Sequence, residues 1–152
     1  MRAITVRQPW AWAIVHGGKD VENRSRNIAG AYRGPVAIHA AMQPDNWWPE
    51  TAPRDILRAV LAGAVAAGVD KRDFWYLRGS LIGVADLVAV HYADTCFDNP
   101  SGPCSRWAVR MHQHLVLANP RPLPEPVRAT GHLGLWTLPA DIEDEVLRQV
   151  TL

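Results

Sequence analysis

The sequence predicts an α+β fold built around a mixed, curled β-sheet. Segments of strand character outnumber helical segments, neighbouring strands are not joined by regular helical crossovers, and one helix separates the first two strands. A doubly wound α/β fold would instead alternate strands and helices along the chain. With 152 residues, 48% of them hydrophobic, the chain is long enough to bury roughly two thirds of its unfolded surface. We expect residues 1–152 to form one domain.

The N-terminal segment predicts a strand, a helix and a second strand. The first strand is expected at residues 4–7. Pro9 then begins a helix over Trp10–His16, because proline suits the first helical position and the residue before it prefers an extended backbone. Two consecutive glycines end that helix, and the second strand follows through Arg24.

A third strand, a long helix and a fourth strand come next. Gly34–Ala40 is apolar, and its Pro35 places it either at the start of a strand or at a sheet edge. Residues 53–68 have apolar side chains at helical spacing, which predicts the longest helix. Ser80–Tyr92 is almost continuously apolar, as in a central strand. Asp86 interrupts it, and we expect this carboxylate to pair with a buried arginine or with backbone amides rather than to act as a catalytic acid.

The C-terminal third predicts two more strands and a terminal helix. The strands are expected at residues 106–117 and 133–138, with the proline-rich segment NPRPLPEPV separating them. The helix is expected over residues 140–150. No internal repeat and no low-complexity tail accompany these elements in the sequence.

Composition and charge exclude two classes of protein. A formal net charge of +1 and an isoelectric point near 7.9 argue against a strongly basic protein that binds nucleic acid over its whole surface. A local basic cleft fits both values. No run of about eighteen apolar residues indicates a membrane helix, and the start MRAITVRQPW lacks the apolar core of a signal peptide. We expect a cytoplasmic protein without a membrane partner.

Cys96 and Cys104 lie in a segment rich in Asp, Asn, Pro, Ser and Gly, which predicts a surface loop. Their spacing allows a small disulfide loop, whereas a reducing cytosol favours free or transiently bridged thiols. A zinc site would need closer pairs and partners such as His91 or His112, which no motif places beside them. We therefore expect neither a metal nor a cofactor.

The most informative segment follows the first helix and carries a cluster of charges. Lys19, Glu22 and Arg24 stand where an apolar helix gives way to a strand, after two glycines that fix the turn. Because strand side chains alternate between faces, Glu22, Arg24 and Arg26 are expected on one face. The residues alone leave two interpretations open. One is a set of solvated charges with an exposed ion pair worth well under about 1 kcal/mol, and the other is a binding site.

A family resemblance favours the binding site. The opening ITVRQPWAWAIVHGGKDVENRS resembles the start of the ASCH domain, and Gly17, Lys19, Glu22 and Arg24 match the GxKxxExR signature of that family. The segments GSLIGVADLV, RWAV and GHLGLW resemble later landmarks of the family, in the same order. ASCH domains are similar to PUA domains. The resemblance therefore implies a PUA-like mixed β-barrel with flanking helices, a cleft floored by the signature residues, and binding of RNA or nucleotides.

The implied cleft raises the question of which aromatic residues line it. Trp10 and Trp12 are two apart on a helix and point to roughly opposite sides, so one of them is expected in the cleft, and we choose Trp10 because it lies nearer the helix start. Trp107 and Trp136 are expected in the core. The candidate nucleic-acid or nucleotide-binding residues are Trp10, Lys19, Glu22, Arg24, Arg26 and Ser105, with Arg7, His39 and the pair Trp47-Trp48 as further candidates.

Three functions remain open. A non-catalytic reader would hold RNA, single-stranded nucleic acid or a nucleoside with Lys19 and Arg24, while Trp10 and Glu22 contact a base, including a modified base. A hydrolase would resemble N4-acylcytidine amidohydrolases or metal-independent ribonucleases, with Lys19 and Glu22 as catalytic residues, although Glu22 replaces the hydroxyl nucleophile of the deacylating relatives. A protein-interaction module in transcription or translation regulation is the least supported. We expect Lys19→Ala to abolish or sharply reduce binding of RNA or nucleosides and to leave the melting temperature nearly unchanged.

Overall fold

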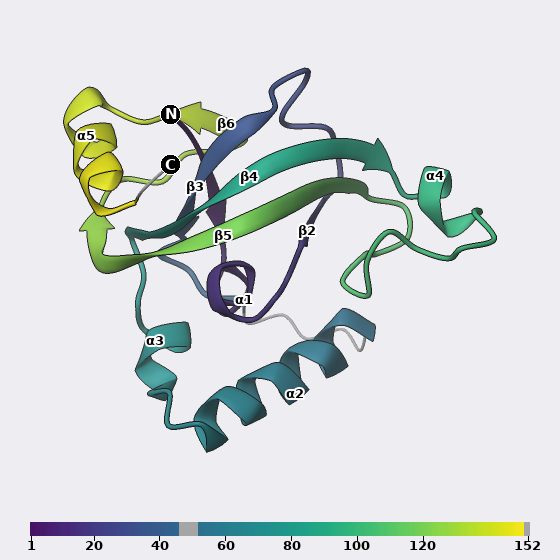
Figure 1. The fold of residues 1–152 in the computed structure, drawn as a ribbon, viewed down its shortest axis with the longest axis horizontal. Helices are drawn as coiled ribbons and strands as arrows, with labels where there is room; N and C mark the ends of the chain where they lie inside the picture. Colours follow the sequence, from purple (N-terminus) through teal and green to yellow (C-terminus); the bar gives the residue numbers. More distant parts are fainter. Residues whose placement is uncertain (46–51, 151–152) are drawn as a thin grey trace.

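A six-stranded sheet organises residues 1–45 and 52–150, the part of the chain that this computed structural model describes. The sheet curls into a half-barrel, with helix α1 against one face and helix α5 against the other (Figure 1). In chain order, the elements are β1 Arg2–Val6, α1 Trp10–His16, β2 Val21–Arg24, β3 Gly34–Ala40, α2 Ala52–Ala66, α3 Lys71–Trp75, β4 Ser80–Tyr92, α4 Asp94–Phe97, β5 Gln113–Arg128, β6 Leu135–Thr137 and α5 Ala140–Gln149.

The strand order β2-β5-β4-β3-β1-β6 makes the sheet mixed. β1 and β3 run parallel, with Ile4 opposite Ile38, and the other neighbouring pairs run antiparallel. The long ladder between β4 and β5 shifts register at three points. Such bulges bend a strand and increase its twist, which explains the curl. The predicted α+β class with a mixed, curled sheet is confirmed.

Helix α1 lies in the concave face of the sheet because its apolar side chains and a glycine in β4 fit together. Ile14 and Val15 are buried against β1, β3, β4 and β5. A Cβ added at Gly83 would lie 2.7 Å from the methyl carbons of Val15, so glycine allows this close approach. On the far side of α1, Trp12 packs on Phe74 and on α2, which covers the helix (Figure 1).

The proline-rich segment is part of a strand, so its predicted role as a separator between strands is wrong. β5 runs from Gln113 to Arg128 and includes the whole segment, whereas residues 106–112 form turns. The β4–β5 register shifts within this segment, so that Pro122 lies opposite Gly83 and Val127 opposite Leu81, and residues 123–126 of β5 are not paired with β4. β2 pairs only with residues 113–116 of β5. A strand tolerates proline at such bulges and at unpaired edges.

Two further details separate the alternatives left by the sequence. Pro35 is the second residue of β3, which lies inside the sheet between β4 and β1, so the start-of-strand alternative is right and the edge alternative is wrong. Asp86 pairs with Arg121 at 2.6 Å and accepts a hydrogen bond from Asn119, as expected of a structural carboxylate. These hydrogen bonds lower the pKa of Asp86.

No helix within the described ranges is both long enough and apolar enough to span a bilayer.

Candidate functional site

Two neighbouring cavities open over the segment that follows α1. We call them the main cavity, with a volume of about 510 Å³, and the side cavity, with about 300 Å³. The main cavity is lined by Thr5, Val6, Arg7, Trp10, Glu22, Asn23, Arg24, Ala41, Asp45 and residues 131–134. The side cavity shares Trp10, Glu22 and Asn23 with it and adds Lys19, Pro53, Arg54, Val109 and His112.

A tight turn at the end of α1 positions the signature residues. The backbone N–H groups of Gly17 and Lys19 both donate to the Ala13 carbonyl at 2.9 Å. Gly18 has φ of 71°, a conformation that favours glycine. A Cβ added at Gly17 would lie 2.9 Å from the Cα of Ala13, so this position has no room for a side chain. The two glycines therefore direct Lys19 back beneath the helix.

Lys19, Glu22 and Arg24 form a chain of ion pairs on the floor of the cavities. The Lys19 ammonium contacts Glu22 Oε2 at 2.7 Å, and Arg24 Nε contacts Glu22 Oε1 at 3.1 Å. Lys19 also donates to the Val21 carbonyl, and Arg24 Nη2 donates to the Thr5 carbonyl at 2.7 Å. The Lys19 side chain is 3% exposed and that of Arg24 is 27% exposed. Arg24 is thus the more accessible cation of the two.

The charges on the floor keep Glu22 ionised. Burial by itself would raise the pKa of this carboxyl group, but the neighbouring charges and hydrogen bonds of Lys19 and Arg24 outweigh burial and lower it. A carboxylate with a lowered pKa accepts hydrogen bonds well and removes protons from a substrate poorly. Glu22 is therefore better suited to recognise a donor than to act as a general base.

Trp10 forms the wall between the two cavities. Its indole Nε1 donates to Asp45 Oδ2 at 2.6 Å, and Arg54 donates to the same oxygen at 3.0 Å. The Arg54 guanidinium and the Lys19 ammonium lie 5.6 and 5.8 Å from the centre of the Trp10 ring. These contacts fix the ring, whereas Trp12 is buried in the cluster beneath α1.

The predicted site residues do not all meet at these cavities. Trp10, Lys19, Glu22 and Arg24 line them, and so does Arg7. Arg26 is exposed and lines neither cavity, because β2 ends at Arg24 and the expected alternation along the strand stops there. Ser105 lines neither cavity either, and its hydroxyl group donates to the Asp20 carboxylate.

Comparison with known families identifies the protein family. The model of the ASCH domain matches residues 4–124. The chain belongs to the ASCH domain family. A search of curated proteins gives no significant match.

Solved structures with the same fold come from the ASCH protein of Zymomonas mobilis. Its crystal structure superposes with a TM-score of 0.58 at 16% identity, over 99% of this chain and 95% of the other. The structure of a tyrosine-to-phenylalanine mutant of the same protein gives a TM-score of 0.55 at 17% identity, over 99% and 98% of the two chains. At this level of identity the match shows the fold, and it confirms the PUA-like half-barrel with flanking helices.

A loop before β5 forms the outer wall of the side cavity in this ASCH domain. Asn23 Nδ2 donates to the Trp107 carbonyl at 2.9 Å, and Asn23 Oδ1 accepts from the Val109 N–H at 2.9 Å. The indole Nε1 of Trp107 donates to the Gly18 carbonyl at 2.9 Å. The loop at residues 105–112, which we call the wall loop, is thus attached to the signature turn through several hydrogen bonds. The predictions that Trp107 and Trp136 are buried are confirmed.

Several lining residues gave no functional signal in the sequence. Asp45 follows the third strand, and residues 131–134 precede the last strand, more than a hundred positions from the signature. The GHLG segment was recognisable as a family landmark, but its place beside the cavity depends on the pairing of β1 with β6. His39 lines another cavity together with Thr5, Met42, Gly79 and residues 128–131. The pair Trp47-Trp48 lies outside the described residues.

Proposed function

We propose that this ASCH domain binds RNA and holds a single nucleotide of it in the main cavity. The observation that supports this proposal most is that one cavity combines an indole wall, Trp10, with an ionised carboxylate, Glu22. Two guanidinium groups line the same cavity, Arg7 exposed and Arg24 half-buried. The family is generally associated with RNA binding. A volume of about 510 Å³ falls within the ordinary range of small-molecule sites, roughly 300–1,000 Å³.

The parts of a nucleotide match different parts of the cavity. Arg7 and Arg24 supply guanidinium groups for phosphate oxygens, which planar guanidinium groups bind in pairs of hydrogen bonds. Glu22, held as an anion, accepts from an amino or imino group of a base. Trp10 offers an aromatic surface, on which unpaired bases of RNA commonly stack. Phosphate contacts set the position, and the carboxylate adds base preference.

The experiment compares two exposed arginines that differ in their distance from the cavity. Binding of a labelled single-stranded RNA oligonucleotide is measured by fluorescence anisotropy at several salt concentrations. Arg7→Ala is expected to weaken binding roughly tenfold and to reduce the salt dependence by about one phosphate contact. Arg26→Ala removes the same charge from outside the cavity and is expected to change affinity less than about twofold. Equal losses in the two variants would refute the main cavity as the site.

A hydrolase acting on N4-acylcytidine or RNA is the alternative function for the same cavity. The lowered pKa of Glu22 argues against it, since a weakly basic carboxylate removes protons poorly. Lys19 is buried and already donates to Glu22 and to the Val21 carbonyl, so it does not point freely toward a substrate. Acetylcytidine and labelled RNA are incubated with the protein, and products are separated by chromatography. We expect the wild-type protein to form no product from either substrate. Products that form with wild type and disappear with Glu22→Gln would show that the domain is a hydrolase and not a non-catalytic RNA-binding domain.

A further inference from the structure

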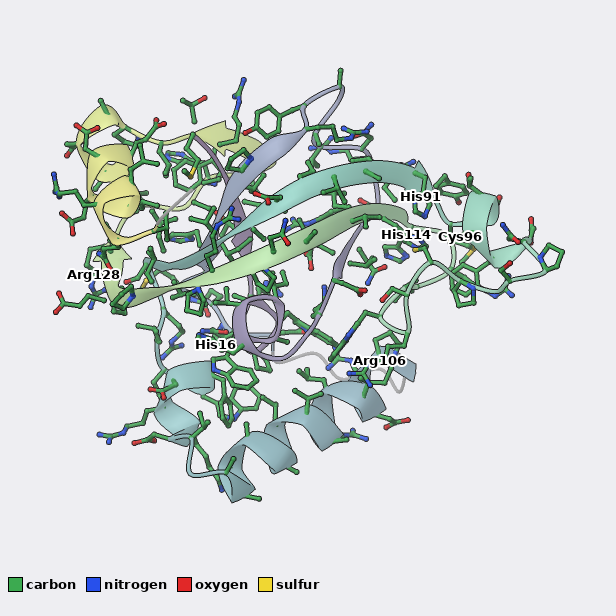
Figure 2. The ribbon with its side chains drawn as sticks, viewed as in Figure 1. His16, His91, Cys96, Arg106, His114 and Arg128 are labelled. Carbon is green, nitrogen blue, oxygen red and sulfur yellow. The ribbon has the colours of Figure 1, made fainter. Side chains whose placement is uncertain are left out.

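Two cysteines and two histidines come together at the end of the β4-β5 ladder, away from the two cavities. His91 lies near the end of β4 and His114 near the start of β5, and the two are paired across the ladder. Cys96 lies on α4, and Cys104 follows in the loop after it. Figure 2 shows His91, Cys96 and His114 gathered where these elements meet. One ligand atom from each of the four residues lies within 4.8 Å of the others.

The distances within this cluster match the edges of a tetrahedron around zinc. With Zn–N near 2.0–2.1 Å and Zn–S near 2.3 Å, two nitrogen ligands are about 3.3 Å apart and a nitrogen and a sulfur about 3.6 Å apart. His114 Nδ1 lies 3.3 Å from His91 Nε2. The same nitrogen lies 3.4 Å from Cys96 Sγ and 3.5 Å from Cys104 Sγ. These three edges, all from His114 Nδ1, have the lengths of a tetrahedral site. The other three pairs of ligand atoms lie within 4.8 Å, so small side-chain rotations would close the cluster on an ion.

The hydrogen bond on the other side of the His114 ring fixes its tautomer. His114 Nε2 lies 2.8 Å from the Val109 carbonyl oxygen. A carbonyl oxygen only accepts, so Nε2 carries the proton, and in the neutral ring Nδ1 presents its lone pair to the cluster. Metal-binding histidines commonly donate their second ring N–H to a backbone carbonyl in this way. His114 is therefore oriented as a ligand before any ion binds.

We propose that His91, Cys96, Cys104 and His114 bind one zinc ion in a closed tetrahedral site. Two thiolates and two imidazoles are a donor set that zinc prefers, whereas hard cations such as Mg²⁺ and Ca²⁺ require oxygen ligands. Binding replaces the protons of the two thiols, which pass to solvent, and involves no oxidation. Four protein ligands leave no coordination position for a substrate, so the ion has a structural role.

The proposed ion would stabilise the wall of the side cavity. Cys104 and His114 flank the wall loop, and the Val109 carbonyl that orients His114 belongs to that loop. The Val109 N–H in turn donates to Asn23, one residue beyond Glu22 in the signature. A short series of hydrogen bonds thus connects the zinc site with the floor of the cavities. This role supplements the proposed RNA binding and does not depend on it.

His112 provides a matched control inside the same loop. The sequence suggested His91 and His112 as the partners that a zinc site would need. The structure brings His91 and His114 to the cysteines, whereas His112 Nδ1 lies 2.9 Å from the Arg110 carbonyl oxygen. The full chain is prepared without an affinity tag, under reducing conditions, and its metal content is measured by plasma mass spectrometry. About one zinc per chain is expected, unchanged in His112→Ala and largely lost in Cys104→Ser and His114→Ala.

Cobalt titration of the metal-free, reduced wild-type protein tests the proposal even where a variant fails to fold, because it needs no substitution. Tetrahedral cobalt bound to thiolates gives intense visible absorption and a sulfur-to-cobalt charge-transfer band, and zinc is expected to displace it. Cys104→Ser is the mildest variant because Cys104 is exposed, and it should lose the charge-transfer intensity in part. A reduced wild-type protein that shows neither zinc nor a tetrahedral cobalt spectrum would overturn the proposal, as would a Cys96–Cys104 disulfide that resists reduction in the native protein.

Discussion

The floor of the cavities and the cysteine-histidine cluster are both compact groups of polar side chains, yet they are built in opposite ways. Lys19, Glu22 and Arg24 belong to one turn and strand, and each charge lies beside an opposite charge. The cluster draws four residues from four parts of the chain, and all of its converging atoms are electron-pair donors. The charges of the floor balance one another without any bound molecule. The cluster instead brings together donor atoms that a cation would bind. The floor is therefore suited to recognise a bound molecule, and the cluster is suited to bind a metal ion.

The largest expected effect is the loss of stability when the buried ion pair between Lys19 and Glu22 is broken. Lys19→Ala removes the buried partner of Glu22 and is expected to lower the free energy of unfolding by about 3 kcal/mol, because it leaves a buried carboxylate with only Arg24. This replaces the sequence-based expectation of an unchanged melting temperature, which assumed an accessible lysine. Urea denaturation measures the loss. Lys19→Met combined with Glu22→Gln should be more stable than Lys19→Ala, and a single variant as stable as wild type would show that the pair is solvated.

Metal removal tests whether the two regions are connected. Incubation with a strong chelator under reducing conditions is expected to increase amide hydrogen exchange across the wall loop and to weaken RNA binding roughly tenfold, because the wall loop holds Asn23, which lines both cavities, through hydrogen bonds with residues 107 and 109. Hydrogen exchange with mass spectrometry and anisotropy are the measurements. Cys104→Ser, which is expected to lack most of its zinc before treatment, serves as the control, because the chelator should change it little. Unchanged hydrogen exchange in residues 105–112 after verified loss of zinc would show that the zinc site does not hold the wall loop in place.

The pH dependence of stability gives a smaller effect that is specific to the floor. Because the pKa of Glu22 is lower in the folded protein than its ordinary value of 4.5, its contribution to stability is present above about pH 4.5. That contribution is lost as the pH falls through the lower pKa of the folded state. Urea midpoints of wild type and Glu22→Gln are compared between pH 7 and pH 3. Their difference should shrink on acidification, and parallel curves would contradict the assigned shift.

The smallest effect comes from an ion pair nearer to solvent. Asp86 and Arg121 are each about a quarter exposed, so Arg121→Ala is expected to cost about 1 kcal/mol or less. Thermal denaturation compares this variant with Lys19→Ala. A loss as large as that of Lys19→Ala would mean that burial does not distinguish the two pairs.

Most elements could be predicted because local patterns specify them. The helix at Trp10–His16 and the strands at Gly34–Ala40 and Ser80–Tyr92 have the predicted bounds, since proline, glycine and apolar periodicity act within a few residues. The short helices α3 and α4 were missed, because a single helical turn gives too few repeats of the pattern. The proline-rich part of β5 was missed because its partner strand β4 lies far away along the chain, and strand pairing there overrides local propensity.

The sequence by itself determined the α+β class, the family and the signature Lys19, Glu22 and Arg24, because these depend on residues close together in the chain. Only the tertiary structure decided that Lys19 is buried, that Arg26 and Ser105 lie outside the cavities, and that Arg7 lines the main one. It also brought His91 and His114 to Cys96 and Cys104. Burial and convergence depend on how strands pair and curl, which is a property of the whole sheet, and no spacing along the chain encodes it locally.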